Sequence, residues 1–448
     1  MNMNSSSVYI FSYIYVEVYT MDNTKLFNKN FTIMAIGQFI SLFGNSLQRF
    51  ALSLLILDLT GSAAIFSAIL ALTFIPQIFI APFGGAIADR VSKKRIMVCL
   101  DTFSGLLLLG FTLIFMNQAA PSTTAIAVLM CIMAVISSIY DPSVRASIPA
   151  LTVPENMASA NSVVSVVSSL TSLLGPIAAG FLYGLYGIEL VFIINIISFL
   201  FSAVMELFLY IPHTRQTLTD SVLKTFLGDI RQTFVYLLRK KPIIAKMLLV
   251  SCSFNLFLTP IYTVGVPFME KIIFGVSDQL YGISEGCVGA GMIIGALLTG
   301  IISKKLPFTK LYCYFYALIA LVLGMGACAL PGILNPQGVS ILSYVLFTCS
   351  GFFFAVVLAI INILCMTYMQ LEIPMEFMGK SMALITALST ALMPIGQIIF
   401  GGLYDVFADK TFIIYVIVAL FCAISTLVTY RMIKTALADG SLKNPAAK

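Results

Sequence analysis

Two acidic residues inside long apolar runs are the strongest chemical signal in the sequence. Glu285 shares a helical face with Gly289 and Met292, and Asp101 lies six residues after a cluster of cations. A charged group inside a membrane span costs at least about 2.5–3.5 kcal/mol, so a functional role is the default hypothesis. A carboxyl group in a medium of low dielectric can bind and release a proton near neutral pH. The sequence therefore predicts proton coupling at Glu285 and Asp101.

Each carboxyl group also has a plainer interpretation. Glu285 is then a solvated carboxylate at the outer mouth of a span. Asp101 is then part of a structural ion pair with Arg90, Lys94 or Arg145, close to the cytosolic side.

Two further acids lie near the ends of apolar runs. Glu206 lies within two turns of Pro212 and is expected to reach cytosolic water. Asp58 ends an apolar run on the opposite side and is expected to be solvated.

Polar residues repeat along single faces of several apolar runs. At 100° per residue Gln38, Asn45 and Arg49 fall within about 40° of one another on a helix. Arg49 is expected either to hold a counter-ion or an anionic group, or to extend to the outer headgroups. As a set, such residues predict the walls of a mostly apolar substrate cavity, whereas any single one is explained as well by hydrogen bonding between helices. The candidate cavity residues are Gln38, Asn45, Arg49, Asn255, Thr259, Tyr262, Met292, Asn362, Thr386, Thr390 and Gln397.

Signatures of enzymes and of metal sites are missing from the sequence. The chain has one histidine, His213, and its nine cysteines form no C-x-x-C pair. Gly379-Lys380-Ser381 resembles the end of a phosphate-binding loop, but Pro374 stands where that loop requires glycine. We therefore expect no metal, no cofactor, no ATP, no nucleic acid and no enzymatic activity, with a proton gradient as the energy source.

The composition excludes a water-soluble protein. Of the 448 residues, 60% are hydrophobic and 10% charged, and the mean hydropathy is +1.02. Soluble domains are about 45–50% apolar and about 25% charged. A bilayer needs about 20 apolar residues per helix. Twelve runs meet that need, at 31–57, 63–88, 96–116, 124–141, 158–183, 189–211, 243–267, 280–302, 311–330, 339–368, 381–404 and 411–433.

These runs predict an all-α polytopic membrane protein with 12 transmembrane helices in two six-helix bundles. The expected parts are a lead-in at 1–30, with Met21 as an alternative start, bundles at 31–211 and 243–433, a connector at 212–242 and a tail at 434–448. The connector carries a basic amphipathic helix at 229–241, which we expect on the inner membrane surface. With a cytosolic N-terminus, all 25 cationic side chains except Arg49, Lys271 and Lys410 lie on the inner side. This bias places both termini in the cytosol.

The two halves of the chain resemble each other. Gly175-Pro176 in the fifth run has a counterpart in Met393-Pro394-Ile395-Gly396 of the eleventh, 218 residues later. A repeat of six helices is typical of transporters, in which two bundles rock around a site near the membrane midplane.

The loop after the second run carries the most specific motif. It contains Gly85, Asp89, Arg90, Lys93 and Lys94. At these residues the chain resembles the major facilitator superfamily, whose second loop reads Gly-x-x-x-Asp-Arg-x-Gly-Arg-Lys; Ser92 departs from it. The resemblance implies that this loop gates the inner side, with Asp89 at the N-terminus of the eleventh helix, here near Ser381. We expect Asp101 and Arg145 to belong to the same gate.

The fifth run resembles the antiporter motif of that superfamily, Gly-x-x-x-Gly-Pro-x-x-Gly-Gly. Gly175, Pro176 and Gly180 match it, while Thr171 and Ala179 replace glycines by other small residues. A packing face alone would also explain these residues. Further segments, such as Tyr140-Asp141-Pro142-Ser143, resemble the branch of macrolide-efflux proteins and enterobactin exporters.

Together these features predict a monomeric transporter in the bacterial cytoplasmic membrane, surrounded by lipid. It is expected to export amphipathic small molecules, such as drugs or macrolide-like compounds, in exchange for protons by alternating access. The alternatives are a proton-coupled uptake symporter and a lipid scramblase on the same scaffold.

Overall fold

The computed structural model describes residues 25–115, 122–211, 233–237, 239, 241–330 and 340–438. For the helical residues 81–90, 115, 375–377, 379–380 and 383, only the backbone is described. Most of the predicted lead-in, the connector with its amphipathic helix, and the end of the tail lie outside the described residues.

The described residues form helices and no strands. In the first half of the chain these are α2 (Lys29–Thr60), α3 (Ala63–Arg90), α4 (Lys93–Phe115), α5 (Thr123–Leu151), the short 3-10 turn η1 (Pro154–Asn156) and α6 (Met157–Leu207). In the second half they are α8 (Pro242–Phe257), η2 (Ile261–Gly265), α9 (Val266–Phe268), η3 (Met269–Ile273), α10 (Asp278–Lys305), η4 (Phe308–Lys310), α11 (Leu311–Ala327), α12 (Ile341–Glu372), α13 (Met375–Ala391), α14 (Met393–Val406), η5 (Ala408–Lys410) and α15 (Phe412–Ala438).

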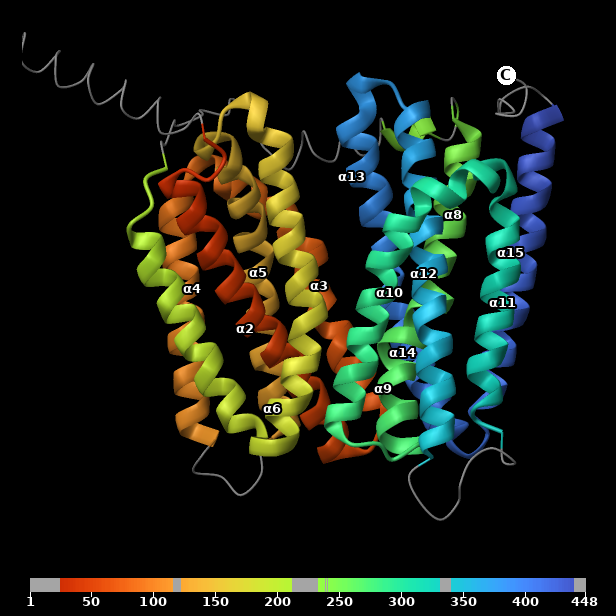
Figure 1. Ribbon diagram of the computed structural model, residues 1–448, viewed down its shortest axis with the longest axis horizontal. Helices are drawn as coiled ribbons and strands as arrows, with labels where there is room; N and C mark the ends of the chain where they lie inside the picture. The colour runs from red at the N-terminus through yellow and green to blue at the C-terminus, as the bar shows by residue number, and fades with distance from the viewer. Residues whose placement is uncertain are drawn as a thin grey trace, which may run out of the picture. The chain divides into compact units, whose positions relative to one another are not determined.

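Eleven continuous helical stretches in the described part of the chain are long and apolar enough to cross a membrane. The difference from the predicted twelve lies in α6, which has 51 residues and includes two predicted runs. At 1.5 Å per residue it would be about 77 Å long, far more than one bilayer needs. Gly187 interrupts it with φ 78° and ψ −178°, a conformation that glycine adopts without steric cost. The ribbon reverses direction within α6 (Figure 1), so the two predicted spans meet at Gly187.

The seventh predicted run is longer than expected. Helix α8 continues through π-helical turns at η2 and η3 and ends at Ile273, six residues beyond the predicted end. Pro260 and Pro267 lie beside these turns. A proline has no N–H to donate, and wide turns of this kind are frequent at functional sites. The extension brings Glu270 into the span.

The eleventh predicted run is divided into two helices. Helix α13 starts at Met375 rather than near Ser381, directly after the extended Pro374, and α14 starts after Leu392 with Pro394 in its first turn. The extended backbone of Pro374 at the N-cap position is incompatible with a helix that continues through it, so it sets the start of α13.

The described residues group into two compact units. Unit 1 comprises the described parts of Met1–Arg49, Phe79–Gly175 and Gly187–Thr217, and unit 2 those of Phe50–Ile78, Pro176–Tyr186 and Leu218–Lys448. Segments 50–78 and 176–186 thus pack with the second half of the chain. The two bundles expected from the sequence, 31–211 and 243–433, remain a prediction.

Each unit has close helix packing of its own. In unit 1, Phe31, Met34, Tyr140 and Val144 belong to a buried apolar cluster. In unit 2, α10 lies beside α12, and α11 beside α15 (Figure 1). A Cβ atom on Gly295 would approach the carbonyl oxygen of Val356 in α12 to 2.5 Å. Only glycine permits this approach, as is common between membrane helices.

Candidate functional site

Glu285 of α10 is held by two tyrosines of unit 2. Tyr262, in the π-helical turn η2, donates a short hydrogen bond to Oε2 of Glu285, and the hydroxyl of Tyr281 lies 3.3 Å from Oε1. Both donors stabilise the ionised carboxylate, and either can follow a change in its protonation by rotating its hydroxyl. Glu285 is half-buried. The structure therefore joins two predicted site residues, Glu285 and Tyr262, in one hydrogen-bonded group.

A second carboxyl group, Glu270 of η3, was missed by the sequence-based prediction. Its side chain is 0% exposed. Ser284 of α10 donates a hydrogen bond of 2.5 Å to Oε1, whereas Oε2 has no hydrogen-bond partner. The charge of Glu285, the residue after Ser284, also acts on Glu270. The sequence signal that could have found Glu270 is the pair Pro260 and Pro267. The π-helical turns beside these prolines continue the helix past the predicted end of the span.

A line of polar groups follows the same stretch of helix. Thr259 Oγ1 donates to Asn255 Oδ1 at 3.3 Å, and Gln397 Nε2 of α14 donates to Thr263 Oγ1 at 3.3 Å. Asn255, Thr259 and Gln397 were all predicted to line a cavity. Here they make hydrogen bonds along and between helices, which was the alternative interpretation of each single residue.

The other predicted cavity residues differ in exposure. Met292, Asn362, Thr386 and Arg49 are exposed, Asn45 and Thr390 are half-buried, and Gln38 is buried with its Oε1 unpaired. Thr390 donates to the carbonyl oxygen of Thr386 one turn earlier. These side chains belong to both units, so the structure does not join them in one site.

In unit 1, Asp101 of α4 is 2% exposed and Glu206 of α6 is 0% exposed. Ser41 of α2 donates to Asp101 at 3.2 Å, and Tyr140 of α5 donates to Glu206 at 2.8 Å. The expectation that Glu206 reaches cytosolic water is therefore wrong. Ser202 lies one turn before Glu206 and faces the Asp101 carboxyl group, so α6 turns this whole face inward.

The cations expected to pair with Asp101 lie elsewhere among the described side chains. Lys94 donates to the carbonyl oxygen of Leu207 at 2.7 Å. Arg145 and Arg49 instead place their charges near Asp141, an exposed residue of α5. The predicted ion pair of Asp101 with Lys94 or Arg145 is thus wrong, because the ends of α4 and α5 direct these cations to other acceptors.

The motif loop joins α3, which ends at Arg90, to α4, which begins at Lys93. The side chains of Gly85, Asp89 and Arg90 lie outside the described residues, so the gating role of Asp89 and any contact of Arg90 with Asp101 remain predictions.

The antiporter-like segment of α6 is a tight packing face. A Cβ atom on Gly175 would collide with Ser46 of α2 in unit 1. In unit 2, a Cβ atom on Gly180 would lie 2.5 Å from the carbonyl oxygen of Asp278 and 3.0 Å from the Cα atom of Gly282 in α10. Gly282 lies three residues before Glu285, so α6 and α10 touch backbone to backbone beside this carboxyl group.

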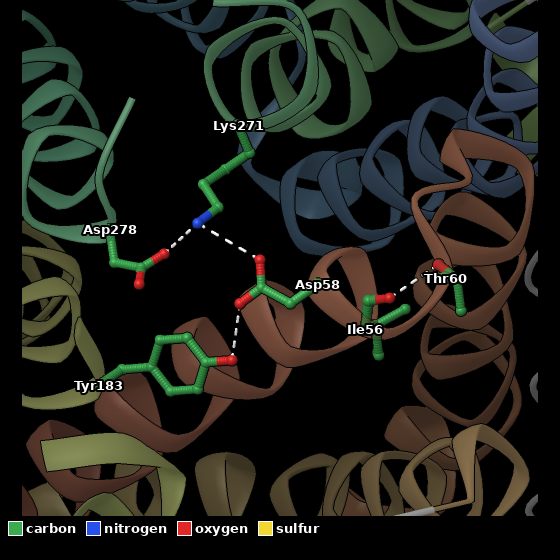
Figure 2. Close-up of polar contacts among 6 residues, drawn as sticks. All are labelled: Ile56, Asp58, Thr60, Tyr183, Lys271 and Asp278. Atoms are coloured by element: carbon green, nitrogen blue, oxygen red, sulfur yellow. Dashed lines mark hydrogen bonds and ion pairs between the residues drawn. The ribbon is translucent and has the colours of Figure 1, made fainter. Parts of the chain in front are cut away.

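Charged groups at the predicted outer ends of several helices form a second cluster in unit 2. Figure 2 shows Lys271 of η3 directed at Asp58 of α2 and Asp278 of α10, with Tyr183 of α6 beside Asp58. Lys271 Nζ lies 3.3 Å from Asp58 Oδ1 and forms a shorter ion pair with Asp278. Tyr183 donates to Asp58 Oδ2 at 2.8 Å. Asp58 is exposed, as expected, and both of its carboxylate oxygens are also engaged.

Asp405, at the end of α14, caps the N-terminus of α3. It accepts hydrogen bonds from Ser62 Oγ at 2.6 Å and from the backbone N–H groups of Ala63 at 2.7 Å and Ala64 at 3.1 Å. A carboxylate at this place satisfies N–H groups that have no partner within the helix and meets the positive end of the helix dipole. The described residues contain no group of three or more His, Cys, Asp or Glu side chains that could hold a metal ion.

Comparison with known proteins gives a consistent match. The family model of the Major Facilitator Superfamily matches residues 34–397. Macrolide efflux protein A of Streptococcus pyogenes is 24% identical over 397 residues, covering 87% of this chain and 91% of the relative. An uncharacterized MFS-type transporter of Bacillus subtilis, YfiS, is 25% identical over 371 residues, covering 82% and 85%.

Two solved structures show a similar fold. The nucleoside transporter NupG aligns with a TM-score of 0.67 and 17% identity, covering 91% of this chain and 99% of that one. A bacterial homologue of the iron transporter ferroportin aligns with a TM-score of 0.65 and 13% identity, covering 90% and 98%.

Proposed function

Because the chain belongs to the Major Facilitator Superfamily, we propose that it exports amphipathic small molecules, macrolide-like compounds among them, in exchange for protons. The protein is an integral, multi-pass membrane transporter and not an enzyme. In this proposal it acts as a monomer in the bacterial cytoplasmic membrane and needs no cofactor besides the proton gradient.

The observation that carries the coupling to protons is the group around Glu285. The hydrogen bond that Tyr262 donates to it joins α10 to the wide turn η2, and Tyr281 of α10 itself is the second donor. The buried Glu270 lies within range of its charge. Two carboxylates that repel each other at low dielectric favour the uptake of a proton. A proton on Glu285 weakens its hold on the two tyrosine hydroxyls, so protonation bears directly on the packing of these helices.

Coupling requires that the proton bind one conformation more tightly than the other. A proton that binds both conformations equally does not change the equilibrium between them. In the proposed cycle, a proton from outside loads Glu285 and substrate from the cytosol enters a cavity whose walls include Asn255, Thr259 and Gln397. Asp101 of unit 1 is the second candidate for proton coupling.

Gates at both membrane faces would alternate. At the outer side, the ion pairs of Lys271 and the cap that Asp405 places on α3 are contacts that must break for substrate to leave. At the inner side, the gate is assigned to Asp89 with Arg90, Lys93 and Lys94, as the family resemblance implies. Each gate then excludes water from one side while the other is open.

The direction of transport rests on the relatives and on helix α6. Macrolide efflux protein A, named for export, matches nearly the whole chain. Gly175, Pro176 and Gly180 match an antiporter motif and hold α6 tightly against its neighbours. Both observations favour export over uptake.

The test uses the purified full chain in liposomes, with radiolabelled erythromycin as the macrolide probe. A gradient of one pH unit contributes about 1.4 kcal/mol per proton, which supports about tenfold accumulation for a one-to-one exchange. We expect erythromycin to accumulate on the side from which protons flow away down their gradient. Addition of an uncoupler should abolish this accumulation.

Three results would contradict the proposal. Accumulation that survives the uncoupler excludes proton antiport. Accumulation in the same direction as the proton flow identifies an uptake symporter, and movement of fluorescent phospholipid without macrolide transport identifies a scramblase.

A further inference from the structure

Four helices of unit 1 converge on two carboxyl groups. Asp101 of α4 accepts from Ser41 of α2, and Glu206 of α6 accepts from Tyr140 of α5. Ser202, one turn before Glu206, faces Asp101, and the charges of Asp101 and Glu206 act on each other. The two acids, far apart in the sequence, are therefore neighbours within one helix packing.

One oxygen of each carboxyl group has no hydrogen-bond partner. These atoms are Asp101 Oδ2 and Glu206 Oε2, on side chains that are 2% and 0% exposed. Buried polar atoms are normally paired, and an unpaired one destabilises the fold, more so when it is charged. A group bound between or on these oxygens would remove that destabilisation.

No cation neutralises the pair among the described side chains. Lys94, the cation of α4 expected there, donates to the carbonyl oxygen of Leu207. Arg145 and Arg49 act on Asp141. Among the described side chains, the ionisable group that faces the pair from α5 is Tyr140, on which the exposed Asp141 also acts. Helix α2 contributes Ser41, and the side chains of Asp89 and Arg90 of α3 lie outside the described residues.

The helix packing keeps water away from the pair. A Cβ atom on Gly37 of α2 would lie 3.3 Å from Ser202 Oγ and 3.9 Å from Glu206 Cγ, and Ser202 donates to the carbonyl oxygen of Gly37 at 3.1 Å. Tyr140 also belongs to the apolar cluster of Phe31 and Met34. Two carboxylates this deep in low dielectric cannot both be ionised without a large cost.

We propose that Asp101 and Glu206 form a protonation site in the first half of the chain, binding at least one proton between them, with Tyr140 as the positioning residue of Glu206. Its part in transport rests on the proposed function, whereas the proton binding itself does not. The site is separate from the group around Glu285, which lies in the other unit. Loss of the proton leaves two negative charges, one on α4 and one on α6, which repel each other. Protonation of the site therefore stabilises the packing of these two helices.

Infrared difference spectroscopy of the full chain in liposomes tests the proton binding directly. A protonated buried carboxyl group gives a C=O stretching band that exchange into D₂O shifts. We expect this band at neutral pH in the wild type, weakened in Asp101→Asn and in Glu206→Gln and unchanged in Glu155→Gln, an exposed acid of the same half. Tyr140→Phe keeps the ring and removes one hydrogen bond, so it should shift the frequency of the band.

The outcomes separate the two proposals. A band that persists unchanged in both Asp101→Asn and Glu206→Gln overturns the protonation site, as does a pair that is fully ionised at neutral pH. A band that disappears when sodium replaces a bulky organic cation at constant pH assigns the site to sodium and also overturns it. If the band behaves as expected but the pH gradient drives no erythromycin transport in the wild type, the site stands and the proposed antiport fails.

Discussion

At the residue scale, the informative side chains are acids, and their neighbours decide what each can do. Glu285 was predicted because it interrupts an apolar run, and the structure adds the two tyrosines that hold it. Glu270 was missed because the sequence places it beyond the expected end of its span. Glu206 was misjudged because distance from a helix end does not tell which way a side chain points.

Glu285→Gln should uncouple the transporter. The amide keeps the size of the side chain but binds no proton, so uphill export of erythromycin in liposomes should fall to background while downhill exchange continues. Asp409→Asn, an exposed acid of η5, is the matched control and should transport normally. Normal uphill transport in Glu285→Gln would remove this residue from the coupling mechanism.

Asp405→Ala should loosen the start of α3. Loss of a capping side chain costs about 1 kcal/mol, which corresponds to about fivefold lower protection from local opening. Hydrogen exchange read by mass spectrometry on peptides containing Ala63 and Ala64 should report this change. The same peptides should be unaffected in Asp409→Ala, and equal protection in Asp405→Ala would show that the cap contributes nothing.

At the scale of the elements, hydrophobicity predicted the helices well because a span requires about 20 apolar residues wherever it occurs. It did not predict where neighbouring spans join or how they bend. The fifth and sixth spans form one element, because Gly187 reverses the chain without a loop of several residues. The seventh runs on through two wide turns beside prolines, which hydropathy does not register.

The contact between α6 and α10 should depend on Gly282. A Cβ atom there would lie 2.8 Å from the carbonyl oxygen of Pro176 and 3.1 Å from the Cα atom of Gly180. Gly282→Ala should therefore cost about 1–3 kcal/mol by overpacking and impair export. Gly300→Ala, on the same helix with nothing near its Cβ position, should be neutral or stabilising. Thermal unfolding of the purified variants by circular dichroism compares the two, and equal stability would contradict the close contact.

At the scale of the whole molecule, the family and the all-helical, membrane-spanning fold were predicted because they depend on composition and on a loop motif. The grouping of segments 50–78 and 176–186 with the second half of the chain was not predicted. It depends on contacts such as that of Asp58 with Lys271, which join residues far apart in the sequence. The periodicity of hydrophobic residues in the sequence does not predict contacts between such distant residues.

Lys271→Met should favour the state in which the outer contacts are broken, because Asp58 and Asp278 then face each other without the cation that joins them. Pulsed electron paramagnetic resonance between spin labels at Leu59 and Val406, both exposed, measures this in a background without the native cysteines. We expect longer distances between the two spin labels in Lys271→Met than in the labelled protein that keeps Lys271. Lys410→Met, which removes an exposed cation of the same side, should leave the distances unchanged; a shift as large in this control would exclude a specific role for Lys271.

The cap on α3 has a consequence for how the protein is made. Asp405 binds groups 341 to 343 residues earlier in the chain. During synthesis, α3 leaves the ribosome long before Asp405 exists, and its first N–H groups lack this acceptor until α14 is inserted. An unsatisfied backbone group in lipid costs several kcal/mol. The start of α3 therefore has to stay near water or be shielded by the insertion machinery until one of the last helices arrives, which makes it a place where quality control can recognise an incomplete chain.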